Sequence, residues 1–128
     1  MKNYFLTSLL LIAVVFSSFA TNNQLNQKIS TVEIEVSGLS TLCKLIQLGD
    51  IDGVKNLIGN GTNINQKSKG MTPLMFAARQ NKVEIVKLLL SRSAKLKTKS
   101  DTGMTALDYA KRSKATESYD LIYSAMNS

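Results

Sequence analysis

The sequence contains no histidine and no tryptophan, and it has only one cysteine and one proline. Without histidine the chain lacks the usual acid–base group of neutral pH, the imidazole of serine and cysteine triads, and the commonest metal ligand. The single Cys43 excludes a disulfide framework. The sequence also lacks a glycine-rich phosphate loop, a carboxylate constellation and any Cys/His metal spacing. We therefore expect a protein that binds rather than catalyses, with no cofactor and no metal.

The length and composition predict one small globular domain. The chain has 128 residues, of which 44% are hydrophobic and 20% charged. These proportions are close to those of ordinary folded proteins, so we do not expect a disordered chain.

Residues 1–20 have the pattern of a secretory signal peptide. Lys2 gives a positive start, Phe5 to Phe16 is apolar apart from two residues, and Ser18 and Ala20 are the small residues before a cleavage point. An uncleaved membrane anchor is the alternative, but a span needs about 20 mostly apolar residues and this segment is shorter. We predict cleavage and no stable membrane insertion. The expected location is the bacterial periplasm, and the alternative is secretion.

The chain is basic, with 16 Lys and Arg against nine Asp and Glu. Removal of residues 1–20 takes away one lysine and no acid, which leaves 15 basic residues, nine acidic residues and a net charge of +6. A basic surface favours nucleic acid, anionic lipid, anionic glycan or an acidic protein. Export argues against nucleic acid, and scattered lysines also serve solubility alone.

A repeat of 33 residues organises the chain. The segment 70–78, Gly-Met-Thr-Pro-Leu-Met-Phe-Ala-Ala, recurs at 103–111 with identical Gly, Met, Thr, Leu and Ala. A weaker copy precedes it at an offset of 32 residues, from Leu42 to Ile64. Such a period is typical of stacked helical repeats.

The Gly-x-Thr-Pro-Leu pattern, the following Ala-Ala and the segment 83–90, Val-Glu-Ile-Val-Lys-Leu-Leu-Leu, resemble the ankyrin repeat family. The resemblance covers about residues 40–126. It implies a mainly α solenoid of about three helix-turn-helix units joined by short hairpin-like fingers. It also implies non-catalytic binding of a protein partner, of unknown identity, through the concave face.

Apolar spacing predicts the same helices independently. Thr72 can cap a helix, Pro73 suits its first position, and the apolar residues that follow recur at helical intervals. The predicted helices cover residues 40–48, 51–59, 73–80, 83–91, 106–112 and 116–126. The ankyrin domain is then 38–128, with units of about 38–66, 67–99 and 100–128. Three units are about the minimum for a continuous core.

Residues 21–37 form an N-terminal lead-in that begins with a polar, Asn- and Gln-rich stretch. Val32, Ile34 and Val36 alternate with polar residues, which predicts a short strand. We interpret this strand as a cover for the exposed end of unit one, since an uncovered unit would expose apolar surface. The alternative is a strand offered to the sheet edge of a partner.

Three departures from the family pattern limit what the resemblance implies. The usual His after Thr-Pro-Leu is Met75, with Cys43 and Asp108 at the matching positions, so the hydrogen bonds of that His are missing. Ser93 replaces the Gly that closes the second helix, where a left-handed backbone would cost about 1 kcal/mol. Lys67 takes the place of an acidic residue, so the fingers are more basic than is typical.

The resemblance also implies the binding residues, which are finger-tip positions and exposed positions at the end of each first helix. Arg79 and Arg112 could form bidentate contacts to carboxylates, and Met71 and Met104 could supply adaptable apolar contacts. The alternative is that the methionines pack between fingers and the arginines are only solvated. The predicted set is Ser68, Lys69, Met71, Arg79, Gln80, Asp101, Thr102, Met104, Arg112 and Ser113, and unit one adds Gln47 and Leu48.

Several alternatives remain open at this point. The protein could be a secreted effector that meets host proteins, or it could bind anionic glycan or lipid through a basic ridge; we expect a monomer in each case. Cys43 is expected to be a buried, inert thiol, or else to pair with another molecule. Asn60 begins a glycosylation sequon whose simpler role is a turn. The basic ridge consists of Lys67, Lys69, Lys95, Lys97 and Lys99, and a solvated finger is the alternative reading of the same residues.

Overall fold

The computed structural model describes residues 38–128, which form six helices in three consecutive pairs. The predicted signal peptide of residues 1–20 and the predicted lead-in and strand of residues 21–37 lie outside the described residues. The predicted helical repeat fold is confirmed. The helices are α2 (Thr41–Leu48), α3 (Ile51–Gly59), α4 (Pro73–Arg79), α5 (Val83–Ser91), α6 (Ala106–Arg112) and α7 (Thr116–Met126).

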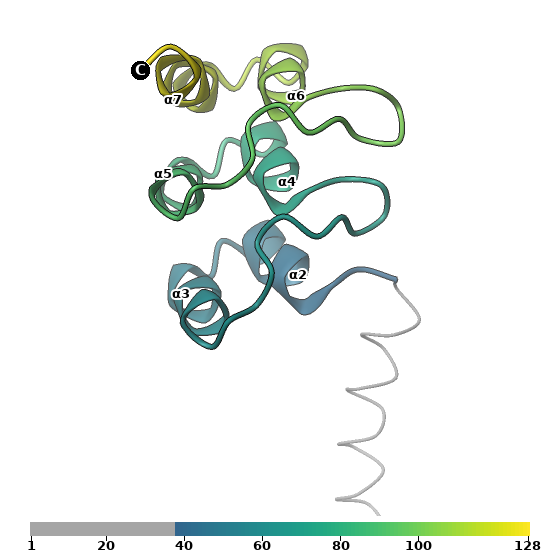
Figure 1. The fold of residues 1–128 in the computed structure, drawn as a ribbon, viewed down its shortest axis with the longest axis vertical. Coiled ribbons are helices and arrows are strands. Elements are labelled where there is room, and N and C mark those ends of the chain that lie inside the picture. Colours follow the sequence, from purple (N-terminus) through teal and green to yellow (C-terminus); the bar gives the residue numbers. More distant parts are fainter. Residues whose placement is uncertain (1–37) are drawn as a thin grey trace, which may run out of the picture. The chain divides into compact units, whose positions relative to one another are not determined.

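The three pairs stack into two helical layers (Figure 1). The inner helices α2, α4 and α6 form the middle column of that view, and the outer helices α3, α5 and α7 form the left-hand column. Helix α4 packs against both α2 and α6, and α5 packs against both α3 and α7. Two long connections, the fingers of residues 60–72 and 92–105, project away from the layers on the side opposite the outer helices.

Side-chain caps begin the inner helices. Ser40, Thr72 and Thr105 each accept a hydrogen bond from a backbone N–H in the first turn. Such a cap stabilises a helix by about 1 kcal/mol. The predicted end of α4 at Gln80 was one residue too late, because Gln80 is the C-cap. The outer helices carry an acidic residue in the first turn, where the helix dipole is positive; these residues are Asp52, Glu84 and Glu117.

The turn after each inner helix takes the left-handed conformation. Gly49, Asn81 and Lys114 occupy equivalent positions there, with φ of 73°, 51° and 57°. Ser93 is left-handed as well, with φ of 61°, so the strained serine predicted at the end of α5 is present. Gly70 combines a φ of 76° with a close approach, since a Cβ there would lie 2.6 Å from Oδ2 of Asp101.

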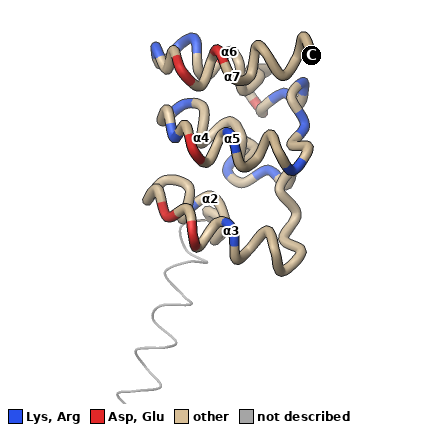
Figure 2. Tube along the Cα trace, turned by 90° about the vertical axis from the view of Figure 1, so that its left-hand side faces the viewer, with Lys and Arg blue, Asp and Glu red and all other residues tan. Residues whose placement is uncertain are grey.

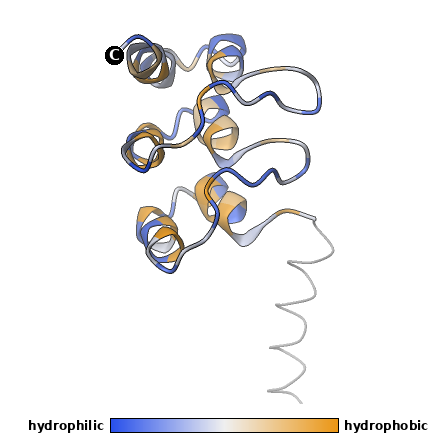
Figure 3. Ribbon diagram, viewed as in Figure 1, coloured by the Kyte–Doolittle hydropathy of each residue, from blue (hydrophilic) through white to orange (hydrophobic). Residues whose placement is uncertain are grey.

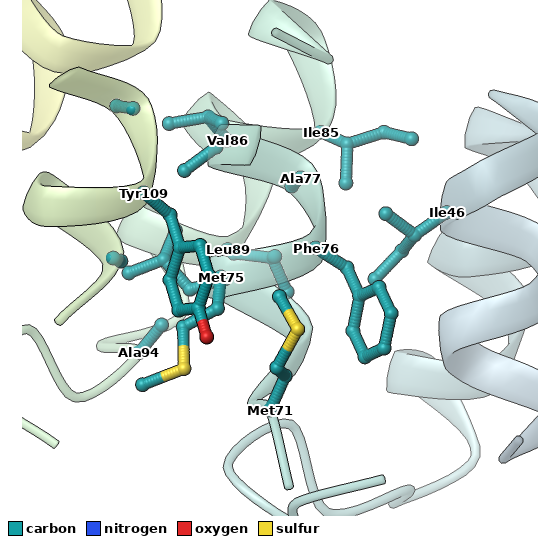
Figure 4. Close-up of a cluster of buried hydrophobic side chains, with 14 of the residues drawn as sticks. Ile46, Met71, Met75, Phe76, Ala77, Ile85, Val86, Leu89, Ala94 and Tyr109 are labelled. Carbon is teal, nitrogen blue, oxygen red and sulfur yellow. The ribbon is translucent and has the colours of Figure 1, made fainter. Parts of the chain in front are cut away.

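The core runs without interruption through the three units. In Figure 3 the apolar residues face the spaces between helices, and the fingers are mostly hydrophilic. Helix α4 is the most buried element, because every residue from Pro73 to Ala78 is buried. Its two alanines, Ala77 and Ala78, are fully buried and allow the neighbouring helices to approach closely. Figure 4 shows the centre of this core around Met75 and Phe76.

The units are hydrogen-bonded to one another although the histidine typical of the family is absent. Ser40 donates its N–H to Oγ of Ser68 at 2.7 Å, which joins unit one to unit two. Oδ1 of Asn81 accepts from Oγ of Ser118 at 2.8 Å and from its N–H at 3.2 Å. Backbone N–H of Asp101 donates to the carbonyl of Gly70 at 3.0 Å. Neighbouring units are therefore joined by hydrogen bonds at the fingers and at the outer helix α7.

Little extended structure is present in residues 38–128. Within these residues the structure shows one isolated β-bridge, between Ser68 and Met71, which agrees with the predicted mainly α fold. None of the described helices has both the length and the apolar character needed to cross a bilayer. The described part of the chain also contains no cluster of three or more potential metal ligands.

Candidate protein-binding face

A groove opens where the finger 92–105 meets the ends of α4 and α6. It has a volume of about 400 Å³ and is called the arginine groove below. Five residues that the sequence predicted for the binding face line it together with one residue that was not predicted. The lining consists of Arg79, Thr102, Met104, Tyr109, Arg112 and Ser113.

The repeat explains why two arginines lie in one groove. Arg79 is the last residue of α4 and Arg112 is the last residue of α6, and the two helices pack side by side. Met104 immediately precedes the N-cap Thr105, so the start of α6 brings the finger next to the groove. Identical positions of consecutive repeats therefore place two guanidinium groups on the same surface.

Tyr109 is the lining residue that sequence reasoning missed. It occupies the repeat position of Phe76, which reads as a simple core position, and only 9% of it is exposed. Its hydroxyl donates to Oγ of Ser100 at 3.1 Å and lies 3.2 Å from Oγ1 of Thr102. The two serine and threonine oxygens are 2.9 Å apart. A tyrosine with two hydroxyl residues close by in the finger was the available signal.

The charges of the groove are not neutralised within the described chain. The two ion pairs of residues 38–128 join Lys67 to Asp101 and Lys87 to Glu84, and neither uses a groove arginine. Nη1 of Arg112 donates to Sδ of Met104 at 3.6 Å, and a thioether is a weak acceptor. The guanidinium groups of this face are therefore open to a stronger acceptor.

The surroundings of Tyr109 lower the pKa of its hydroxyl. Hydrogen bonds from Ser100 and Thr102 to the ionised oxygen lower the pKa of Tyr109, and the positive charges of Arg79 and Arg112 lower it further. Both arginine charges therefore act on the same point at the base of the groove.

The structure buries two of the predicted binding residues, Ser68 and Met71, so they offer little surface to a partner. Ser68 is 6% exposed, and its hydroxyl is used between units, since it accepts from Ser40 and donates to the carbonyl of Gly38 at 3.3 Å. Met71 is 8% exposed and belongs to the core cluster drawn in Figure 4. Met71 is therefore a packed residue, as the alternative reading expected, and it packs within the core cluster. Met104 is only partly buried, since no further finger of the described chain covers it.

The other predicted residues are exposed but do not line the groove. Lys69 and Asp101 lie at the finger tips, and Asp101 pairs with Lys67 at 3.4 Å. Gln80 caps the end of α4. In unit one Leu48 is 69% exposed and lines a separate, shallower hollow with the start of α5.

The remaining candidates have simple environments. All five lysines of the basic ridge are exposed, and Figure 2 shows basic residues along the connection after α5. Cys43 is fully buried, and burial raises the pKa of its thiol, which disfavours the reactive thiolate. Asn60 is the C-cap of α3 and is exposed.

Comparison with known families identifies the repeat. A family model described as ankyrin repeats (three copies) matches residues 42–127. Mouse ankyrin repeat, SAM and basic leucine zipper domain-containing protein 1 is 42% identical over 55 residues, which are 42% of this chain and 12% of that protein. Human ankyrin repeat and SOCS box protein 11 is 40% identical over 60 residues, covering 47% of this chain and 19% of the relative. The chain therefore spans less than a fifth of the length of these two relatives.

Two further matches cover a larger share of the matched protein. Human protein phosphatase 1 regulatory subunit 27 is 32% identical over 78 residues, which are 60% of this chain and 51% of that protein. Among solved structures, a chain of the Bd0816 predatory endopeptidase complex with immunity protein Bd3460, from Bdellovibrio bacteriovorus, is 37% identical and matches with a TM-score of 0.62. That match covers 66% of this chain and 45% of the other chain.

Proposed function

Because the chain belongs to the ankyrin repeat family, whose repeats mediate protein–protein interaction, we propose that it is an exported, non-catalytic module that binds a protein partner through its concave face. The concave face is defined here by the exposed finger tips and the ends of the inner helices. One observation carries the proposal. The arginine groove gathers five predicted binding residues from two consecutive units into one surface.

Export and the monomeric state are also part of the proposal. The support for export is the charged start, apolar stretch and small-residue cleavage pattern of residues 1–20. The periplasm is the proposed location, and secretion toward host proteins is the alternative. A monomer leaves the whole concave face available to the partner.

In-cell cross-linking of the C-terminally tagged protein, followed by extraction of each compartment, tests this function. We expect one dominant exported protein to be recovered with the wild-type chain. The control is the charge reversal Arg79→Glu/Arg112→Glu, which should abolish recovery and leave the circular dichroism melt nearly unchanged. Recovery that survives the reversal, or recovery of polyanions alone, contradicts binding through this face.

A narrower role is favoured by one finding, which is the similarity to a chain of the endopeptidase–immunity protein complex. A protein that binds an exported endopeptidase across its concave face would protect the producing cell by covering the enzyme. The test is to co-produce the protein with the exported endopeptidases of its own cell and measure cell lysis. Protection that is lost in the arginine reversal supports this role. Equal lysis with and without the protein excludes it.

A further inference from the structure

The arginine groove combines features that select one kind of chemical group. It presents two exposed guanidinium groups on a surface where none of the lining residues is acidic. The nearest finger-tip acid in sequence, Asp101, is already paired with Lys67. An incoming group of negative charge is therefore attracted by both arginines without displacing an internal ion pair.

The base of the groove is held in a fixed arrangement. Tyr109, Ser100 and Thr102 bond to one another through their hydroxyls at 2.9 to 3.2 Å. Backbone N–H of Met104 donates to Oγ of Ser100 at 3.2 Å, which ties the finger to this network. Sδ of Met104 contacts Arg112 in turn. Arg112 therefore contacts a residue whose backbone is tied to the base of the groove.

We propose that the arginine groove binds an Asp or Glu carboxylate from an acidic segment of the partner protein, with the neighbouring residue of that segment resting on Met104. A guanidinium group offers paired N–H donors that match the two oxygens of a carboxylate. A volume of about 400 Å³ accommodates an acidic side chain together with an adjacent apolar one. This inference rests on the proposed function and specifies the chemistry of the partner.

The basic ridge lacks the paired N–H donors that select a carboxylate. Its lysines carry compact charges on exposed, flexible stems, and none of them lines the arginine groove. Lysines of this kind attract many polyanions without selecting a planar two-oxygen group. The ridge therefore supplies the matched control for charge in the experiment.

Selection of a random dodecapeptide display library on the purified, immobilised protein tests the proposal. We expect the enriched peptides to share an Asp or Glu at one aligned position. The best peptide and its amide twin, with Glu→Gln or Asp→Asn at that position, are then titrated calorimetrically. The amide twin should bind about tenfold or more weakly, as expected when one partner of a charge-assisted pair is removed.

Three protein variants locate the effect. Arg79→Gln/Arg112→Gln should weaken the acidic peptide about as much as the amide substitution does, and should bind both twins equally. Lys97→Gln/Lys99→Gln removes the same charge from the ridge and should bind within about twofold of the wild type. Ser113→Trp fills the groove without changing charge, and it should block both twins.

The outcomes separate this inference from the proposed function. Peptides that are lost in Ser113→Trp but show no acidic position, or bind Arg79→Gln/Arg112→Gln normally, overturn the carboxylate site and leave concave-face binding intact. A library that yields no binder overturns the recognition of an acidic segment, and binding of a folded partner through the concave face is then decided by the cross-linking experiment above. Binders that resist Ser113→Trp but are lost with the ridge variant overturn both proposals.

Discussion

At the scale of single residues, the left-handed positions determine where a side chain costs stability. Ser93 adopts φ of 61° immediately after α5, and its Cβ is disfavoured in that conformation. Replacement by glycine removes the steric cost and adds a smaller cost from the freer unfolded chain. We expect Ser93→Gly to raise the free energy of unfolding by about 0.5 to 1 kcal/mol, measured by urea denaturation at 222 nm.

Ser91 supplies a matched control for this substitution. It is the last residue of α5, and its hydroxyl donates to the carbonyl of Leu88 at 2.7 Å. Ser91→Gly therefore places the same glycine in a helical position, where it should lower the free energy of unfolding. Destabilisation by both substitutions would mean that Ser93 is not strained.

Asn81 uses its left-handed position to join two units. Its Oδ1 accepts both the N–H and the hydroxyl of Ser118, and Ser118 is fully buried. Asn81→Ala leaves these two donors without that acceptor, so we expect a loss of about 1 to 3 kcal/mol in chemical denaturation. Lys114 has the same backbone conformation in unit three, and Lys114→Ala should change stability by less than about 0.5 kcal/mol. Equal effects of the two substitutions would remove the inter-unit bond as the cause.

At the scale of helices, the start of α6 is stabilised by a charged reciprocal cap. Oγ1 of Thr105 accepts from the N–H of Asp108, and Oδ2 of Asp108 accepts from the N–H and the hydroxyl of Thr105, both at 2.9 Å. The equivalent residue in unit two is Met75, whose sulfur accepts from the N–H of Thr72. The carboxylate is the stronger acceptor, so the cap of unit three depends on its ionisation.

This dependence gives a pH prediction of defined sign. The backbone and side-chain hydrogen bonds from Thr105 lower the pKa of Asp108 below its ordinary value of 3.8. A lowered pKa in the folded state means that ionised Asp108 stabilises the fold above the unfolded pKa, and that this contribution is lost as pH falls through the folded pKa. At neutral pH we expect Asp108→Asn to lose about 0.5 kcal/mol, because the group is exposed and screened.

The measurement is a pair of thermal melts of the wild type and Asp108→Asn across the acidic range. The difference between the two should shrink as pH falls from about 5 to about 2, since protonation removes the same contribution from the wild type. A difference that stays constant over this range would assign the effect to helix propensity instead of charge.

At the scale of the whole molecule, the repeat made the fold predictable. The offsets of 32 and 33 residues carry the apolar spacing and the helix ends from one unit to the next, so the bounds of α3, α5, α6 and α7 follow directly. The local signals of α4, Thr72 and Pro73, gave its start correctly. Its end was placed one residue late, because nothing in the local sequence separates the last helical residue from its cap.

The residues of the candidate face could be predicted only where equivalent positions of two repeats are equally exposed. Arg79 and Arg112 end their helices in equivalent positions, so they could be assigned to one surface. Met71 and Met104 are equivalent in sequence but differ in burial, because only the first belongs to a finger that is followed by another finger. The bond from Asn81 to Ser118 depends on a contact between two units, which a single repeat does not encode. The hydroxyl network of Tyr109 lies within unit three and depends on how the finger folds back onto α6.

The stacking also predicts where the molecule opens first. Unit two is packed on both sides, and α4 has six consecutive buried residues, whereas Val54 is the one buried residue of α3. In a solenoid each unit is stabilised mainly by its neighbours, so units one and three should open locally before unit two. We expect native-state hydrogen exchange to be slowest at the amides of α4 and α5 and clearly faster in α3 and α7. Exchange rates are compared after correction for intrinsic rates and across two pH values, and equally slow exchange in α3 and α4 would show that the three units open as one.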